Sequence, residues 1–156
     1  MDTGPFSPRP VGEPQPAVLL LPRPCPDDVP IGLPFGYDPD YPTADHFHKG
    51  QDWKAPKGTP DWFREAGTVV WCHDTGQLGN YIAIQCDRDP NVHRGLAHQS
   101  EIYVAEGQHV EAGEVVGLSG GVPGEPGAGL TTGPHIHEEE WAGALFTGER
   151  VDPYRV

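Results

Sequence analysis

The chain has 156 residues and a formal net charge of −13, and this length suffices for one domain with its own hydrophobic core. The charge excludes a nucleic-acid partner, because binding to phosphates requires a basic surface. The 19 Pro and 21 Gly residues argue against a helical bundle and favour short strands joined by many turns. We therefore expect a mainly β protein, built as a small antiparallel sheet or a barrel-like domain.

Residues 1–32 form a Pro-rich N-terminal extension, and we place the folded domain at residues 33–156. Proline-rich chain tends to be extended, so this segment either links the domain to something else or wraps around it. Its longest apolar run, residues 17–21, is too short for a membrane span. The first four residues lack the basic region of a signal peptide, so we expect no export signal.

The first candidate site follows a polar loop at residues 38–45. In the segment His48-Lys49-Gly50-Gln51-Asp52, an imidazole and a carboxylate lie four residues apart. The central Gly, with Pro56 and Gly58 soon after it, favours a loop that enters a strand over a helix. His46 is a rival ligand because it lies two residues before His48, but we prefer His48 because its spacing pairs it with Asp52.

The middle of the chain predicts a β-hairpin, with strands at residues 68–72 and 81–86 and a turn at residues 75–80. Cys72 and Cys86 would not lie opposite each other in it. With Cys25 they make an odd and sparse set, so we expect three free thiols. Residues 104–117 predict further tight hairpins, and no segment predicts a helix longer than two turns.

The second candidate site is the segment His135-Ile136-His137, which follows a long Gly- and Pro-rich loop at residues 120–133. In a strand the two histidines would face one side together, with the isoleucine on the other. Two imidazoles and one carboxylate are typical of a catalytic zinc site, where a fourth position remains for water. A long loop that arrives directly at such a site is more often functional than not.

In their order and spacing, these segments resemble the lysostaphin-like, LytM-type zinc endopeptidases, which cut peptidoglycan peptides. The resemblance runs from about residue 33 to residue 153 and implies a long groove in the β domain. It is carried by seven motifs, which are His48–Asp52, Gly58–Pro60, Gly79–Asn80, Ala97–His98, the Gly-rich pattern within Val104–Gly117, Gly133–His137 and Val151–Pro153.

The resemblance also implies roles for single residues. It makes His48, Asp52 and His137 the ligands of one zinc ion per chain. It makes His98 and His135 the catalytic pair beside the metal. A loop tyrosine donates to the oxyanion in this family, and Tyr41 or Tyr37 matches it, although a position at the rim of the site explains both residues equally well.

The sequence departs from the family pattern in three places, none of which removes a ligand. Residues 120–133 are longer than the usual connection, Leu96 replaces an aromatic residue, and Asp61 replaces an apolar one. Residues 138–140 are all Glu; they could orient a ligand imidazole, but we favour solvated charges at a strand end. We place most of the four tryptophans in the core and three histidines at the surface, namely His73, His93 and His109.

We therefore expect a zinc-dependent endopeptidase that hydrolyses peptide bonds of bacterial peptidoglycan. Its place of action would be the cell wall, as a lysis enzyme of phage type, a virion-borne domain or one domain of a longer protein. A catalytically inactive relative that binds peptidoglycan or a partner is the alternative, although its usual mark is a lost ligand. The hairpins also resemble biotinyl and lipoyl carriers, but those need an exposed Lys, and no Lys follows Lys57.

Overall fold

The computed structural model describes residues 19–155 as an all-β protein, with no helix among these residues. This confirms the expected mainly antiparallel β domain. The strands are short because Gly- and Pro-containing turns interrupt the chain often. In chain order they are β1 (Gly36–Tyr37), β2 (Phe47–His48), β3 (Gln51–Trp53), β4 (Pro60–Trp62), β5 (Gly67–Asp74), β6 (Asn80–Cys86), β7 (Val92–Ala97), β8 (Gln99–Ile102), β9 (His109–Val110), β10 (Val115–Ser119), β11 (Ile136–Ala142) and β12 (Glu149–Val151).

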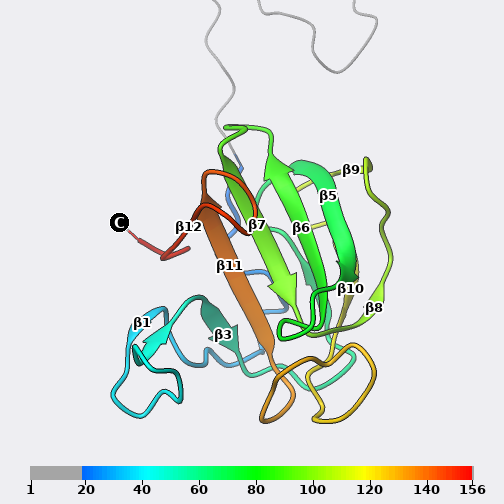
Figure 1. The fold of residues 1–156 in the computed structure, drawn as a ribbon. Helices are drawn as coiled ribbons and strands as arrows, with labels where there is room; N and C mark the ends of the chain where they lie inside the picture. Colours follow the sequence, from blue (N-terminus) through cyan, green and yellow to red (C-terminus); the bar gives the residue numbers. More distant parts are fainter. Residues whose placement is uncertain (1–18, 156) are drawn as a thin grey trace, which may run out of the picture.

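The main sheet has seven strands in the order β12-β11-β7-β6-β5-β9, with β3 paired to β11 beside this path (Figure 1). A second sheet has the order β4-β10-β8, and β1 and β2 pair as a separate ribbon. Figure 1 shows β3 and β1 near the end where β11 begins. The first and second candidate sites therefore meet at this end of β11.

The predicted hairpin is confirmed as β5 and β6, which pair antiparallel around a turn at residues 75–79. Cys72 lies opposite Ile82 and Cys86 lies opposite Gly67, so the two thiols are apart in the register. All three cysteines are free, as predicted. Among residues 19–155 there is no helix of the length and apolar character that crossing a membrane requires.

The two faces of the main sheet have different roles. One face packs its large aliphatic side chains, such as Ile82 and Ile136, against Val116 of β10 to form the main core. The opposite face carries a smaller cluster, which includes Tyr81 and Ala97. Because side chains alternate along a strand, the same alternation that buries Ile136 turns His137 to this second face, where the site lies.

The part of the N-terminal extension that the structure describes lies against the domain. The backbone N–H of Leu21 donates to Arg64, and that of Trp62 donates to Pro24. Cys25 and Val29 are buried in the main core. Residues 19–32 therefore wrap around the domain, which was one of the two alternatives for this segment, and residues 1–18 lie outside the described range.

Candidate active site

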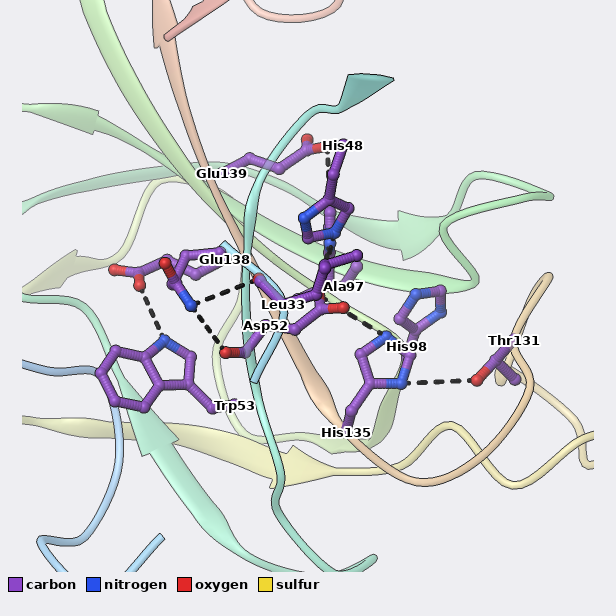
Figure 2. A network of polar contacts seen from close by, with 12 residues as sticks. Leu33, His48, Asp52, Trp53, Ala97, His98, Thr131, His135, Glu138 and Glu139 are labelled. Carbon is purple, nitrogen blue, oxygen red and sulfur yellow. Dashed lines mark hydrogen bonds and ion pairs between the residues drawn. The ribbon is translucent and has the colours of Figure 1, made fainter. Parts of the chain in front are cut away.

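Three potential metal ligands meet where β2, β3 and β11 come together. One ligand atom from each of His48, Asp52 and His137 lies within 4.8 Å of the other two. The Oδ1 atom of Asp52 lies 3.3 Å from Nε2 of His48 and 2.9 Å from Nδ1 of His137. In Figure 2 the Asp52 carboxylate lies between the rings of His48 and His135. These are the residues that the sequence motifs single out.

The local sequence explains why these side chains meet. His48 ends β2 and Asp52 lies within β3, with the short turn of Lys49 and Gly50 between them. In the register of β3 with β11, Asp52 lies directly opposite His137. A Cβ atom at Gly50 would meet the His137 ring 2.6 Å from its Cε1 atom, so only glycine fits between the two strands at this point.

The hydrogen bonds of the two imidazoles fit a metal site. Nδ1 of His48 donates to the carbonyl of Pro34 at 2.9 Å. This leaves the lone pair of Nε2, which faces Asp52, available to a metal ion. In His137 the arrangement is reversed, because Nε2 contacts Glu139 at 2.9 Å and Nδ1 faces Asp52. Ligands about 2.0–2.1 Å from a tetrahedral zinc lie about 3.3 Å apart, which agrees with the contact of His48 with Asp52.

The electrostatics of this cluster favour a cation. Burial alone would raise the pKa of Asp52, but hydrogen bonds from His137 and His48 outweigh it and hold this pKa well below its usual range. Burial alone would lower the pKa of His137, but hydrogen bonds to Asp52 and Glu139 outweigh it and raise the pKa to about 10. Two carboxylates thus stabilise positive charge at this point, which a proton or a metal ion can supply.

His98 and His135 lie beside the metal cluster. Their ring centroids are 4.8 Å apart, and the His98 centroid lies 6.1 Å from that of His137. Nε2 of His135 lies 3.9 Å from Oδ1 of Asp52. Burial, followed by the nearby charges of His135 and His137, lowers the pKa of His98 to about 4. His98 is therefore a neutral imidazole near pH 7.

The long loop at residues 120–133 sets the orientation of both rings. Nδ1 of His98 donates to the carbonyl of Ala128 at 2.6 Å, and Nδ1 of His135 donates to the carbonyl of Gly133 at 2.8 Å. The hydroxyl of Thr131 lies 3.5 Å from Nδ1 of His135 (Figure 2). In the neutral tautomer that these contacts favour, Nε2 of each ring is the acceptor atom.

His98 also has a special backbone. Its φ is 58°, a left-handed value that is uncommon for a residue other than glycine. The residue follows the end of β7, and its N–H donates to the carbonyl of Leu78 at 2.8 Å. Such backbone strain persists only where the surroundings enforce it, and it is frequent at functional sites.

The structure shows which of the two tyrosines lies beside the cluster, and which of the rivals His46 and His48 belongs to it. The Tyr41 ring lies 5.1 Å from the His48 ring, and burial, followed by the charge of Asp52, raises the Tyr41 pKa. Tyr37 is 68% exposed. His46 is exposed and its Nδ1 contacts the carbonyl of Tyr41. Tyr41 therefore lies beside the cluster, whereas Tyr37 and His46 do not take part in it.

Two of the surface assignments are wrong. Glu138, Glu139 and Glu140 are all buried, although we expected solvated charges. His93 is buried as well, because its Nδ1 contacts the carbonyl of Gly143. The acidic side chains are accommodated inside the protein by hydrogen-bond and ion-pair partners from distant parts of the chain.

Glu139 is the functional residue that sequence reasoning ranked too low. Its Oε2 contacts Nε2 of His137 at 2.9 Å and accepts a hydrogen bond from Arg150 at 3.2 Å. Its Oε1 accepts from the hydroxyl of Tyr81 at 2.8 Å. The available signal was the alternation of the strand, which places Glu139 on the same face as His137.

Asp61, which departs from the apolar pattern, is completely buried behind the site. Its Oδ2 accepts a hydrogen bond of 2.6 Å from Gln99, the residue after His98. The other carboxylate oxygen, Oδ1, and the Gln99 oxygen Oε1 have no hydrogen-bond partner among the described residues. Burial, opposed by the hydrogen bond from Gln99, raises the pKa of Asp61 to about 7.

Comparisons with known proteins agree with this site. The model of Peptidase family M23 matches residues 46–153. The peptidoglycan DD-endopeptidase ShyA of Vibrio cholerae is 39% identical over 92 residues, which are 59% of this chain and 20% of that protein. The DD-carboxypeptidase/endopeptidase Mpg of Neisseria meningitidis is 35% identical over 128 residues, which are 81% of this chain and 26% of that protein. The chain thus spans about a fifth to a quarter of the length of these curated relatives.

Solved structures show the same fold. The catalytic domain of a mutant of the prophage-encoded M23 protein EnpA from Enterococcus faecalis superposes with a TM-score of 0.70 and 29% identity, covering 83% of this chain and 92% of that chain. The catalytic domain of lysostaphin from Staphylococcus simulans gives a TM-score of 0.71 and 25% identity, covering 80% of this chain and 89% of that chain. The described β domain therefore corresponds to nearly the whole of these two catalytic domains.

Proposed function

Because the chain belongs to peptidase family M23, we propose that it is a zinc-dependent endopeptidase that hydrolyses peptide bonds in bacterial peptidoglycan. One observation carries the proposal. A cluster of two imidazoles and a carboxylate lies beside two further imidazoles whose Nε2 atoms are free. The relatives named as peptidoglycan DD-endopeptidase and DD-carboxypeptidase/endopeptidase support the substrate class. The bacterial cell wall is therefore the proposed place of action.

We assign the metal-binding role to Nε2 of His48, Oδ1 of Asp52 and Nδ1 of His137. This donor set is typical of catalytic rather than structural zinc sites. When bound, zinc supplies Lewis-acid chemistry, because it polarises a peptide carbonyl and makes water a nucleophile near neutral pH. Glu139 holds the His137 ring so that Nδ1 faces the cluster, as carboxylates do behind many metal-binding histidines.

His98 and His135 carry the proton transfers in this proposal. Their Nδ1 protons are engaged by backbone carbonyls, so Nε2 of each ring can accept a proton from the attacking water and return it to the leaving amine. Tyr41, beside His48, is positioned to donate its hydroxyl proton to the oxygen that becomes negative during the attack.

The test is digestion of purified peptidoglycan by the zinc-loaded protein, with the products identified by mass spectrometry. His98→Ala should keep zinc and fold but lose roughly 10²–10⁴-fold in rate, the usual worth of acid–base help. His135→Ala should likewise keep zinc and lose activity, whereas His137→Ala should lose the metal. His109→Ala is the matched control, because this exposed imidazole on β9 contacts Asp87 and none of the proposed site residues, and it should change neither property.

Chelation should abolish the activity, and added zinc should restore it. The proposal fails if the zinc-loaded protein releases no new amino termini from walls of several chemical types. If the protein still binds those walls, a catalytically inactive peptidoglycan-binding relative is the correct description. If His135→Ala loses zinc and His137→Ala keeps it, the ligand assignment within this motif is wrong.

A further inference from the structure

A groove lies between the β1–β2 ribbon and strand β12, next to the metal cluster but separate from it. Its volume is about 590 Å³, and its walls include Phe35, Phe47, Lys49, Trp141, Phe146 and Arg150. The groove is therefore lined by aromatic rings together with two cations. None of these residues has a role in the proposed chemistry at the metal.

Arg150 connects this groove to the metal cluster. On β12 it lies opposite Trp141 of β11, and its guanidinium lies 5.0 Å from the centroid of the Trp141 ring. Its Nη1 donates to Oε2 of Glu139 at 3.2 Å, and the same oxygen contacts His137 at 2.9 Å. The guanidinium is thus two hydrogen bonds away from a proposed zinc ligand, on the groove side of it.

Most other cations of the described chain are already engaged. Arg88 and Arg94 are paired with Glu65, Arg155 is paired with Glu140, and Lys57 is paired with an acidic residue of the loop at residues 120–133. These pairs stabilise the fold and leave little positive charge for a ligand. Because the chain has a net charge of −13, a cation with unused N–H donors beside the candidate active site indicates a binding position for an anionic group.

Arg150 has such spare donors. A guanidinium carries five N–H donors, and within residues 19–155 the bond to Glu139 is the one hydrogen bond that the Arg150 side chain makes. Its side chain is 32% exposed, so part of the guanidinium reaches the groove. Two acidic residues, Glu149 and Asp152, also line the groove, but Oδ1 of Asp152 is occupied by the backbone N–H of Tyr154 at 2.8 Å.

We propose that Arg150 determines specificity by binding a free carboxylate of the substrate on the residue next to the cleaved bond. The inference rests on the proposed function. A guanidinium with an aromatic ring on one face and free N–H groups pairs with carboxylates in a bidentate manner. Because Arg150 is joined to His137 through Glu139, we place the carboxylate on a residue adjacent to the cleaved bond.

The chemistry of the substrate identifies the residue that carries this carboxylate. The residue on the carbonyl side has used its own α-carboxyl group in the bond that is cut. An α-carboxylate beside the bond therefore belongs to the residue that leaves as the amine, and it lies two covalent bonds from the scissile nitrogen. Substrates of this class end at the leaving residue or are cross-linked through a side-chain amine whose carbon also bears a carboxylate.

The test compares two synthetic peptides that differ only in this group, which is a free carboxylate in one and a carboxamide in the other. We expect the zinc-loaded wild type to prefer the carboxylate peptide by roughly 10- to 100-fold in kcat/KM, the worth of a charge-assisted hydrogen bond. Arg150→Gln should abolish this preference, mainly through KM. Arg150→Lys should keep part of it, because the charge remains but the bidentate geometry is lost.

The decisive measurement is the ratio of kcat/KM for the carboxylate peptide to kcat/KM for the carboxamide peptide. Loss of the hydrogen bond to Glu139 lowers both values by the same factor, so it cancels in this ratio. Arg155→Gln is the matched control. It removes the same charge from a nearby residue whose partner, Glu140, faces the other side of β11. This variant should keep the wild-type ratio.

Each contrary outcome has a distinct meaning. If the wild type cleaves both peptides equally well, or Arg150→Gln keeps the preference, Arg150 does not read the carboxylate while the peptidase function stands. If Arg155→Gln abolishes the preference as well, the effect is one of net charge and the inference is wrong. If the zinc-loaded wild type cleaves neither peptide and no peptidoglycan, both proposals fall.

Discussion

Replacing Asp61 by Asn should stabilise the protein at neutral and alkaline pH. Asp61 is completely buried, and burial raises its pKa from 3.8 to about 7. Because a change of one in pKa corresponds to 1.36 kcal/mol, the ionised carboxylate lowers the free energy of unfolding by about 4 kcal/mol. Asparagine carries no charge, so Asp61→Asn removes this cost.

The sign of the pH dependence follows from proton binding. In the unfolded chain the Asp61 carboxyl loses its proton near pH 4, whereas in the folded protein it keeps the proton up to about pH 7. Between these values the folded state binds more protons, so wild-type stability falls as the pH rises. The gain from Asp61→Asn should therefore be small at pH 4 and complete above pH 7.

The hydrogen bonds point in the same direction. An Asn side chain can accept the bond that Gln99 now donates to Asp61, and its amide can donate to Oε1 of Gln99, which has no partner among the described residues. At 2–4 °C for each kcal/mol in a chain of this size, the expected rise in Tm at pH 8 is roughly 8–16 °C.

Thermal unfolding of wild type and Asp61→Asn between pH 4 and pH 8 tests this reasoning. Asp40→Asn is the control, because Asp40 is exposed and its replacement should shift Tm by less than about 2 °C at any pH. Parallel Tm curves for wild type and Asp61→Asn would show that the Asp61 carboxyl titrates normally in the folded protein. The argument from burial would then be refuted.

Three further predictions concern the site and the core. Glu139→Gln should lower zinc affinity roughly 10- to 100-fold in competition with a chelator, because it weakens the support of His137; unchanged affinity would contradict this role. Gly50→Ala should also weaken zinc binding, since the added Cβ would collide with the His137 ring, and an intact affinity would show that β3 and β11 can separate. Ile84→Ala should cost about 2–5 kcal/mol in urea unfolding, because Ile84 is fully buried in the main core, and a loss below about 1 kcal/mol would contradict its place there.

The sequence predicted the features that depend on neighbouring residues. The β5–β6 hairpin follows from β-branched and aromatic residues on both sides of a Gly-rich turn. The turn at Gly50 and the alternation at Ile136 are local as well, so the pairing of His48 with Asp52 and the shared face of the two histidines around Ile136 could be anticipated from their spacing. The choice of His137 as the ligand came from the resemblance. That the two motifs lie together could be predicted only from the resemblance, because no local pattern predicts the pairing of β3 with β11.

The burial of charged residues could not be predicted in this way. Residues 138–140 look like a solvated acidic run, but their partners come from distant strands and the C-terminal segment. Glu138 accepts hydrogen bonds from Trp53 and Tyr154, while Glu140 is paired with Arg94. A carboxylate becomes tolerable inside a protein only when such partners arrive, and their arrival depends on the topology of the whole sheet.

The loop at residues 120–133 orients the two proposed catalytic imidazoles through the main-chain oxygens of Ala128 and Gly133. A point mutation replaces a side chain but leaves the main-chain carbonyl in place. During evolution the non-glycine positions of this loop can therefore change without disturbing the ring tautomers, whereas an insertion or deletion would move both carbonyls at once. Its glycines at positive φ are constrained as well, because a Cβ at Gly127 would collide with Nδ2 of Asn80. The length of the loop and its glycines are then the properties under selection, and libraries that vary Val122, Pro123, Glu125 and Pro126 at constant length should retain folded proteins with correctly oriented histidines.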